Sequence, residues 1–117
     1  MSTLCENTLA QFMGSENQYR HVLVKGFHYT DGIQYVASAG EAYWLIDLIA
    51  CAQLEKTVRQ EPFQHWLLKV TGSSAVITAD DGNGKKVFQQ DIEYTNFSLE
   101  SLSMYVCDGV LMLASEY

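Results

Sequence analysis

Histidine is the side chain that most readily moves a proton or holds a metal at neutral pH. The chain has three of them, His21, His28 and His65. None belongs to an H-E-x-x-H pattern, in which two histidines one helical turn apart bind zinc from one face of a helix. No second ligand motif accompanies them, so we expect no metal site and no cofactor.

Cysteine is the next residue type with nucleophilic or metal-binding chemistry, and Cys5, Cys51 and Cys107 lie far apart in the chain. They are odd in number and form no C-x-x-C pair, so they indicate neither a disulfide framework nor a zinc site. Cys51 stands in an apolar helical pattern, where a buried thiol is unreactive. We expect three reduced thiols, two of which fill space in the core.

The run Asp80-Asp81-Gly82-Asn83-Gly84 resembles two kinds of ligand-binding loop in part. A calcium loop needs an oxygen ligand at its fifth position, where this chain has Lys85 if counting starts at Asp81. A phosphate loop needs Ser or Thr after its lysine, where this chain has Lys86. We interpret the run as the turn of a β-hairpin.

Asp47 lies inside the most apolar segment of the chain, between Trp44 and Cys51. An acid in such a place lies either at a wet rim or in a buried pair with a hydroxyl, a backbone group or a cation. A pocket in which Asp47 meets His21 or His65 would make the chain a small enzyme or a small-molecule-binding domain. This stays an alternative, because one acid without a mapped partner has no defined catalytic role.

The segment around Asp47, residues 41–56, is the only long helical pattern, and its apolar side chains do not form a single stripe. One face holds Leu45, Leu48, Ile49 and Ala52, and the nearly opposite face holds Tyr43, Trp44, Ala50, Cys51 and Leu54. A helix that is apolar all round must be covered on more than one side. The cover is either the sheet together with the N-terminal segments, or a second protein or a second copy packed on Tyr43 and Trp44.

The residues before this helix are predicted to form a short helix and a hairpin. Residues 3–13 begin with the capping-box pair Thr3 and Glu6 and are followed by Gly14, which favours a helix. Residues 19–25 and 33–37 are rich in β-formers and flank the turn signal of residues 30–32, which favours two paired strands.

The second half of the chain has the pattern of an antiparallel sheet. Strand-like runs cover residues 63–70, 75–79, 86–94, 102–107 and 110–114, the last two joined by Asp108-Gly109. In the third run the side chains expected to pack on the central helix are Phe88, Gln90, Ile92 and Tyr94. The predicted fold is a single α+β domain over residues 1–117, an antiparallel β-meander packed against a central helix.

Composition restricts the partners of this domain. With 117 residues and 48% hydrophobic side chains, the chain has one core and no room for a second domain. Seven basic and fourteen acidic residues give a net charge of −7, which disfavours direct binding to nucleic acid. The same charge favours a basic protein partner.

The N-terminal residues show no basic segment followed by an apolar run, as a secretory signal would. The longest apolar stretch, residues 42–52, is much shorter than the about twenty residues that a membrane span needs. We therefore expect a cytoplasmic protein that does not bind membranes.

Several stretches taken together carry a family resemblance. They are residues 9–16 (LAQFMGSE) with 19–21 (YRH), 30–32 (TDG), 42–47 (AYWLID), 94–99 (YTNFSL) and 113–117 (LASEY). Over nearly its full length the chain resembles a family of small bacterial proteins of unknown function that also occurs on plasmids and phages. That family reads T-D-F-P-L where this chain has residues 95–99 (TNFSL). The resemblance implies a setting rather than an activity: small acidic proteins of mobile elements often bind and block a host defence complex, as anti-CRISPR proteins do.

These observations favour a non-enzymatic protein-binding module, an anti-CRISPR-like inhibitor of a basic, nucleic-acid-binding host complex. A small enzyme or ligand-binding domain, or a structural homodimer built on the central helix, are the alternatives. We expect the partner to contact an acidic and aromatic surface formed by Tyr43, Trp44, Asp80, Asp81, Asp91 and Glu93.

Overall fold

The structure, a computed structural model, describes residues 18–21, 23–97 and 99–117 of the 117-residue chain. The predicted helix over residues 3–13 lies outside the described residues. The helices are α2 (Asp31–Ala39), α3 (Tyr43–Ala52), α4 (Lys56–Arg59) and a final 3₁₀ turn η1 (Ala114–Glu116). The strands are β1 (Gln18–Arg20), β2 (His28–Thr30), β3 (Phe63–Thr71), β4 (Ser74–Asp80), β5 (Lys86–Ile92), β6 (Ser101–Cys107) and β7 (Val110–Leu113).

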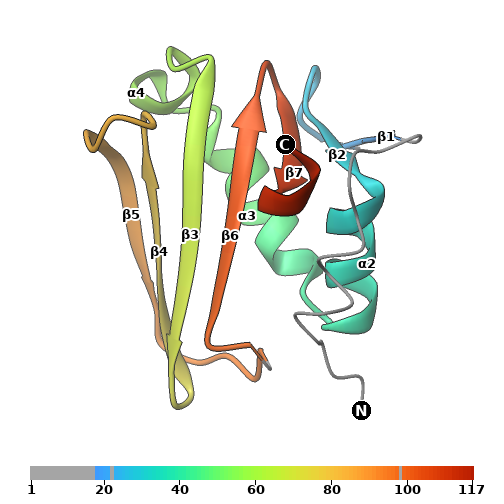
Figure 1. The fold of residues 1–117 in the computed structure, drawn as a ribbon, viewed down its shortest axis with the longest axis vertical. Coiled ribbons are helices and arrows are strands. Elements are labelled where there is room, and N and C mark those ends of the chain that lie inside the picture. Colours follow the sequence, from blue (N-terminus) through green and yellow to red (C-terminus); the bar gives the residue numbers. More distant parts are fainter. Residues whose placement is uncertain (1–17, 22, 98) are drawn as a thin grey trace.

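The strands form one sheet in the order β1-β2-β7-β6-β3-β4-β5, with helices α2 and α3 behind it (Figure 1). All neighbours are antiparallel except β2 and β7, which run parallel. Within the described part of the chain no α-helix covers the other side of the sheet, which we call the open face. Of the described helical segments, only the 3₁₀ turn η1 lies on that side, in front of β7 in Figure 1. The α+β prediction is confirmed.

Two-residue turns join the strands of the hairpins β3–β4 and β6–β7. Gly72 has a φ of 63° in the two-residue turn between β3 and β4, a conformation that glycine adopts without strain. Asp108 and Gly109, with φ of 51° and 82°, form the predicted turn between β6 and β7. The predicted antiparallel pairs are therefore present, with boundaries within one or two residues of those expected.

Strand β6 departs from a simple meander. It does not pair with β5, the strand before it, but returns across the sheet to the free side of β3, with His65 opposite Tyr105. This crossing places β3 inside the sheet, between β6 and β4, and leaves β5 at its edge. Register between strands that are distant in sequence depends on side-chain packing, which local patterns do not specify.

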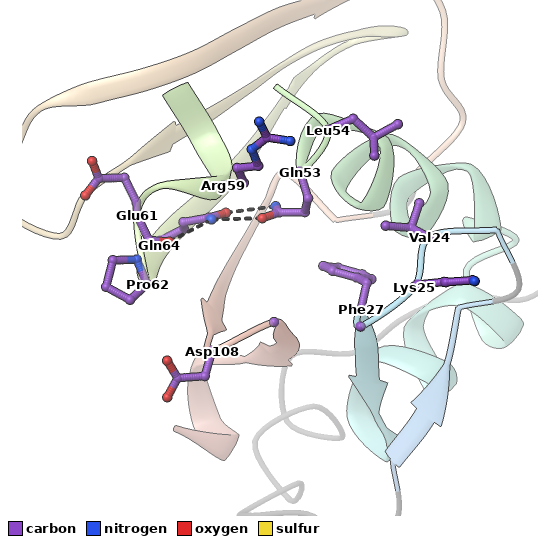
Figure 2. Close-up of a pocket in the computed structure, with 12 residues that line it drawn as sticks. Val24, Lys25, Phe27, Gln53, Leu54, Arg59, Glu61, Pro62, Gln64 and Asp108 are labelled. Atoms are coloured by element: carbon purple, nitrogen blue, oxygen red, sulfur yellow. Dashed lines mark hydrogen bonds between the residues drawn. The ribbon is translucent and has the colours of Figure 1, made fainter. Parts of the chain in front are cut away.

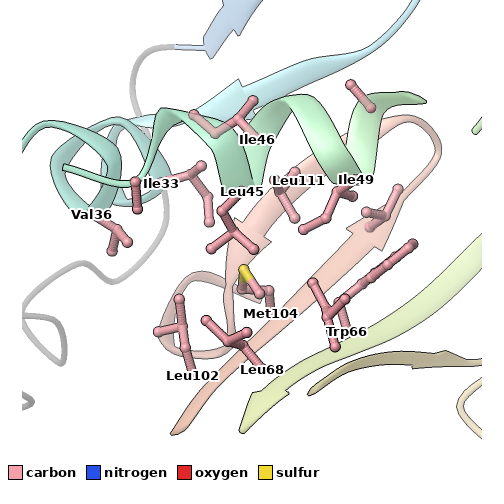
Figure 3. Close-up of a cluster of buried hydrophobic side chains, with 14 of the residues drawn as sticks. Ile33, Val36, Leu45, Ile46, Ile49, Trp66, Leu68, Leu102, Met104 and Leu111 are labelled. Atoms are coloured by element: carbon pink, nitrogen blue, oxygen red, sulfur yellow. The ribbon is translucent and has the colours of Figure 1, made fainter. Parts of the chain in front are cut away.

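The core lies between the sheet and α3. In Figure 3, Leu45 and Ile49 of α3 point toward Met104 and Trp66 of the sheet, and all four side chains are at most 2% exposed. The indole N–H of Trp66 donates to Gln64 Oε1 at 2.9 Å, so the largest buried side chain leaves no unpaired donor. Burial of apolar groups of this size contributes about 1.5–3 kcal/mol each relative to exposure.

The predicted strand over residues 33–37 is wrong, because these residues belong to α2. Its buried side chains Ile33, Val36 and Ala37 recur at helical spacing, and Asp31 in the first turn suits the helix dipole. The hairpin is formed instead by β1 and β2, with Tyr19 opposite Tyr29. The spacing of three and four residues between these apolar side chains indicates a helix more strongly than the β-propensity of single residues indicates a strand.

The predicted central helix over residues 41–56 is shorter in the structure. Glu41 has a φ of 53°, which no α-helix accommodates, so α3 starts at Tyr43. At the other end the amides of Gln53, Leu54 and Glu55 bond to carbonyls three residues back, which tightens and ends the helix. A separate turn, α4, follows.

The described residues cover α3 on more than one side, as expected, but they do not cover it all round. Its buried side chains are Leu45, Ile46, Ile49, Ala50 and Ala52, so the sheet, α2 and the segment before β2 cover two flanks. The third flank is in water: Tyr43 is 50% and Leu54 65% exposed. Cys51 is exposed on this flank and Cys107 is half-buried, so these two thiols do not fill the core as expected.

None of the helices in the described ranges is long and apolar enough to cross a bilayer.

Candidate functional site: the α3–β5 groove

A shallow groove of about 490 Å³ runs between helix α3 and edge strand β5. Helix α3 contributes Trp44, Leu48 and Cys51, and β5 contributes Phe88 and Gln90. Trp44, Leu48 and Phe88 are half-buried and pack against the core, so the floor of the groove is apolar and fixed. We call this feature the α3–β5 groove.

The prediction for the faces of β5 accounts for this floor. Phe88, Gln90 and Ile92 pair with the buried residues Ala79, Ile77 and Ala75 of β4 and share their side of the sheet. The Phe88 ring also lies 5.3 Å from that of Trp66. Tyr94, expected on the same face, lies beyond the end of β5 and is 74% exposed.

Strand β5 has a free outer edge along the groove, since no described strand pairs with it there. The Thr71–Ser74 pair closes a two-residue turn and is therefore hydrogen-bonded, and bonded pairs alternate along antiparallel ladders. Because Ser74, Val76 and Thr78 bond to β3, the backbone groups of Ala75, Ile77 and Ala79 face β5. Their partners Ile92, Gln90 and Phe88 therefore turn their own backbone groups inward, toward β4. The groups of Gln89 and Asp91 point outward, available to a further strand.

The surroundings of the groove are acidic. Asp47 and Glu55 line it, and none of its eight lining residues is basic. Asp91 and Glu93 are exposed at the end of β5. Positive charge lies at the opposite end of the strand, where Lys86 Nζ donates to Gln89 Oε1 at 2.5 Å.

The six predicted contact residues do not form one patch. Trp44 lies in the groove, and Asp91 follows its lining residue Gln90. Tyr43 stands at the start of α3, half exposed, and its hydroxyl accepts a hydrogen bond from Gln34 Nε2 at 2.9 Å. Asp80 is the last residue of β4, Asp81 lies in the turn before β5, and Glu93 lies beyond the other end of β5.

The Asp80-Asp81 pair builds the turn between β4 and β5. Asp80 Oδ1 accepts the amide of Gly82 at 2.7 Å, and Asp81 Oδ1 accepts those of Asn83 and Lys85 at 2.8 and 3.1 Å. The backbone N–H of Asn83 in particular holds the pKa of Asp81 below its ordinary value. These carboxylates have internal hydrogen-bond partners, and the hairpin interpretation of this run is correct.

Of the two histidines considered as partners of Asp47, the structure brings only His21 into contact with it. His21 Nε2 donates to Asp47 Oδ1 at 2.9 Å, whereas His65 lies on the open face of the sheet. His21 Nδ1 accepts the amides of Leu23 and Val24 at 3.2 and 3.1 Å, so both ring nitrogens are occupied. A buried ring without a spare nitrogen is a tether between α3 and the segment before β2 rather than a base for catalysis.

A second cleft, of about 500 Å³, opens at one end of the sheet (Figure 2). Its centre is closed by Gln53 and Gln64, whose side-chain amides exchange two hydrogen bonds of 2.9 Å. Arg59 and Glu61 are both among its lining residues, so its charge is mixed. The amides at its base already have partners, and the cleft favours no particular ligand.

The sequence analysis missed a chain of polar side chains on the open face. His65 lies between Asp80, 3.1 Å from its Nδ1, and Ser103, 2.8 Å from its Nε2. The two-residue turn at Gly72-Ser73 was the available signal, because it sets His65 opposite Asp80 in the hairpin. Ser103 had no such signal, since β6 joins β3 from far along the chain.

Four of the stretches that carry the family resemblance meet in space, as two pairs. Glu116 of the last stretch accepts the Thr30 hydroxyl at 2.6 Å and the Gly32 amide at 3.2 Å, both from the TDG stretch. Asp47 of the AYWLID stretch holds His21 of the YRH stretch. These contacts tie the C-terminus and α3 to the N-terminal part of the described chain, so these four stretches have structural roles.

One of three comparisons with known proteins finds a match. No curated protein and no solved structure matches it. The family model that does match, described as a family of unknown function (DUF6876), covers residues 3–117. With nearly its whole length inside that match, the chain belongs to this family of unknown function.

Proposed function

We propose that this protein is a non-enzymatic binding module that takes up an extended, basic and apolar segment of a partner protein along β5. The segment adds as a further strand to the free edge of β5, and its alternate side chains enter the α3–β5 groove. The observation that supports this most directly is the apolar groove between a helix and an unpaired edge strand. Peptide-binding domains use the same combination, with backbone bonds for affinity and side-chain pockets for specificity.

The residues of the groove define the chemistry of the segment. Trp44, Leu48 and Phe88 offer apolar contact to every second side chain of an added strand. Asp47 and Glu55 at the rim favour Lys or Arg among those side chains. A net charge of −7 steers a basic partner toward the molecule and repels an acidic one.

Nucleic-acid-binding complexes are the class of partner that presents such basic segments. We therefore propose, as the finer statement, that the protein occupies a basic segment of such a complex and blocks it, in the manner of an inhibitor of host defence. This finer statement rests on the charge and on the setting that the resemblance implies, whereas the groove supports the binding mode alone.

Selection from a library of random linear heptapeptides tests the binding mode without a known partner. Enriched peptides should alternate apolar side chains with Lys or Arg, and their affinity should fall with rising salt. Gln89→Pro removes an outward N–H from an edge strand that tolerates proline. It should weaken binding at least about tenfold, the effect of losing about 1.4 kcal/mol.

A matched pair of variants tests the groove separately. Cys51→Arg places a cation in the groove and should abolish binding, whereas Ser38→Arg adds the same charge to an exposed site on α2 and should leave it unchanged. Circular dichroism must show native folding for each variant. No alternation or basic residue among the enriched peptides, or equal affinity of the two arginine variants, would refute the proposal.

A further inference from the structure

We propose that Ser103 is a nucleophile that accepts an acyl or phosphonyl group from activated esters, with His65 as its general base and Asp80 as a positioning residue. The site lies on the open face of the sheet, whereas the α3–β5 groove lies on the helix side. The two proposals therefore depend on different residues and fail independently.

The geometry is that of a hydrogen-bonded relay across three neighbouring strands. Asp80 Oδ2 on β4 lies 3.1 Å from His65 Nδ1 on β3, and His65 Nε2 lies 2.8 Å from Ser103 Oγ on β6. His65 is opposite Asp80 in the register, and Ser103 is diagonal to His65 because it pairs with Leu67. All three side chains are partly exposed, so a reagent in solution has access to them.

The hydrogen bonds fix the direction of proton transfer. A carboxylate only accepts, so the Nδ1–H of the neutral His65 ring donates to Asp80. Nε2 then carries the lone pair and accepts the Ser103 hydroxyl proton, as a general base must. The amide of Gly82 donates to the other oxygen of Asp80 at 2.7 Å, which holds the carboxylate in place.

The surroundings define the substrate class. Phe63, Tyr105 and Tyr117 form an aromatic cluster beside His65, with the Tyr105 ring 5.4 Å from the imidazole and 4.9 Å from Tyr117. Such a cluster suits the apolar or aromatic part of an ester. Lys69, diagonal to Ser103 on the same face, provides a cation for the negative charge that develops on the ester oxygen.

The reaction of a fluorophosphonate at this site balances simply. The Ser103 oxygen forms a bond to phosphorus as the P–F bond breaks, fluoride leaves with the bonding pair, and the hydroxyl proton passes to His65 Nε2 and then to solvent. With an activated carboxylic ester, the same proton goes to the leaving alcohol oxygen and the acyl group stays on Ser103.

A fluorophosphonate probe, followed by peptide mapping of the full-length protein, tests the proposal. The label should lie on Ser103, and Ser103→Ala should lose it. Ser101→Ala, two residues earlier on the same face and exposed, is the matched control and should label like the wild type. His65→Gln should slow labelling about a hundredfold, the scale of general-base catalysis, and Lys69→Gln and Asp80→Asn should slow it by smaller factors.

The pH profile separates reactivity from a merely structural role. Wild-type labelling should rise with pH, as expected of a reaction with a general base, and this rise should vanish in His65→Gln while its circular dichroism spectrum stays native. No label on wild-type Ser103, labelling of Ser101 at an equal rate, or a His65→Gln variant that labels like the wild type would each overturn the proposal.

Discussion

The buried carboxylate of Glu116 joins the C-terminus of this chain to the start of α2 through hydrogen bonds. Glu116 is 8% exposed and accepts the Leu113 amide at 2.9 Å besides its bonds to Thr30 and Gly32. A Cβ on Gly32 would approach Glu116 Oε1 to 2.5 Å, so glycine is required for this close contact. The C-terminal stretch therefore serves as the cap of α2 that the sequence before the helix lacks.

Removing the Glu116 carboxylate should destabilise the fold. Glu116→Ala leaves three buried donors without this acceptor, and we expect the free energy of unfolding to fall by about 3 kcal/mol. Urea denaturation measures the change. Glu100→Ala, at an exposed position, is the control and should stay within about 0.5 kcal/mol of the wild type. Equal losses in both variants would contradict this role.

Asp81 gives the turn before β5 a pH dependence of known sign. Backbone N–H donors, that of Asn83 first, hold its pKa below 3.8, so the folded state favours the carboxylate. Its contribution is complete above the unfolded pKa and is lost as pH falls through the lower folded pKa. Wild type should therefore exceed Asp81→Ala in stability at neutral pH, by an amount that shrinks in acid.

Denaturation of both proteins across the acidic range measures this difference. Asp81→Asn keeps an acceptor oxygen but does not titrate, so the difference between Asp81→Asn and Asp81→Ala should not depend on pH. A wild-type advantage over Asp81→Ala that grows toward acid would contradict the assignment.

Turns decide the arrangement of elements as much as strands do. Gly109 has a φ of 82°, and a Cβ there would meet Gly26 O at 2.7 Å. Gly72 has a φ of 63° with open space around it. Gly72→Ala should cost about 1 kcal/mol for the left-handed conformation alone. Gly109→Ala should cost at least about twice that, because it also forces two loops apart, and thermal unfolding compares the two.

Elements joined by local turns were predictable from the sequence, and those joined by long-range packing were not. The hairpins β3–β4 and β6–β7 follow from their glycine turns, and the first of them also places His65 opposite Asp80. The site of Ser103 depends on β6 returning to β3. The exposed flank of α3 depends on where α2 packs, which no local pattern contains.

The candidate contact surface shows the same limit. Tyr43 and Trp44 were placed on α3 correctly, because helical periodicity is local. Asp80 and Asp81 stay predicted partner contacts, and the structure adds that both of them accept hydrogen bonds within the hairpin. A turn acid that bonds its own backbone looks identical in sequence to one that faces a partner.

Charge governs the behaviour of the whole molecule in solution. Two copies carry −7 each, and pairing along β5 would bring their Asp91 and Glu93 side chains to the same new sheet. We expect a monomer by light scattering at low salt. A stable dimer that Gln89→Pro dissociates would assign the β5 edge to a second copy instead of to a foreign segment.

Amide hydrogen exchange with and without a selected peptide tests the binding mode most directly. In the free protein the inward amides of β5, those of Phe88, Gln90 and Ile92, should be protected, and the outward amides of Gln89 and Asp91 should exchange freely. Peptide binding should protect these outward amides while exchange at β1, the opposite edge, stays unchanged. A peptide that binds tightly yet leaves both outward amides exchanging as before would contradict the strand-addition account.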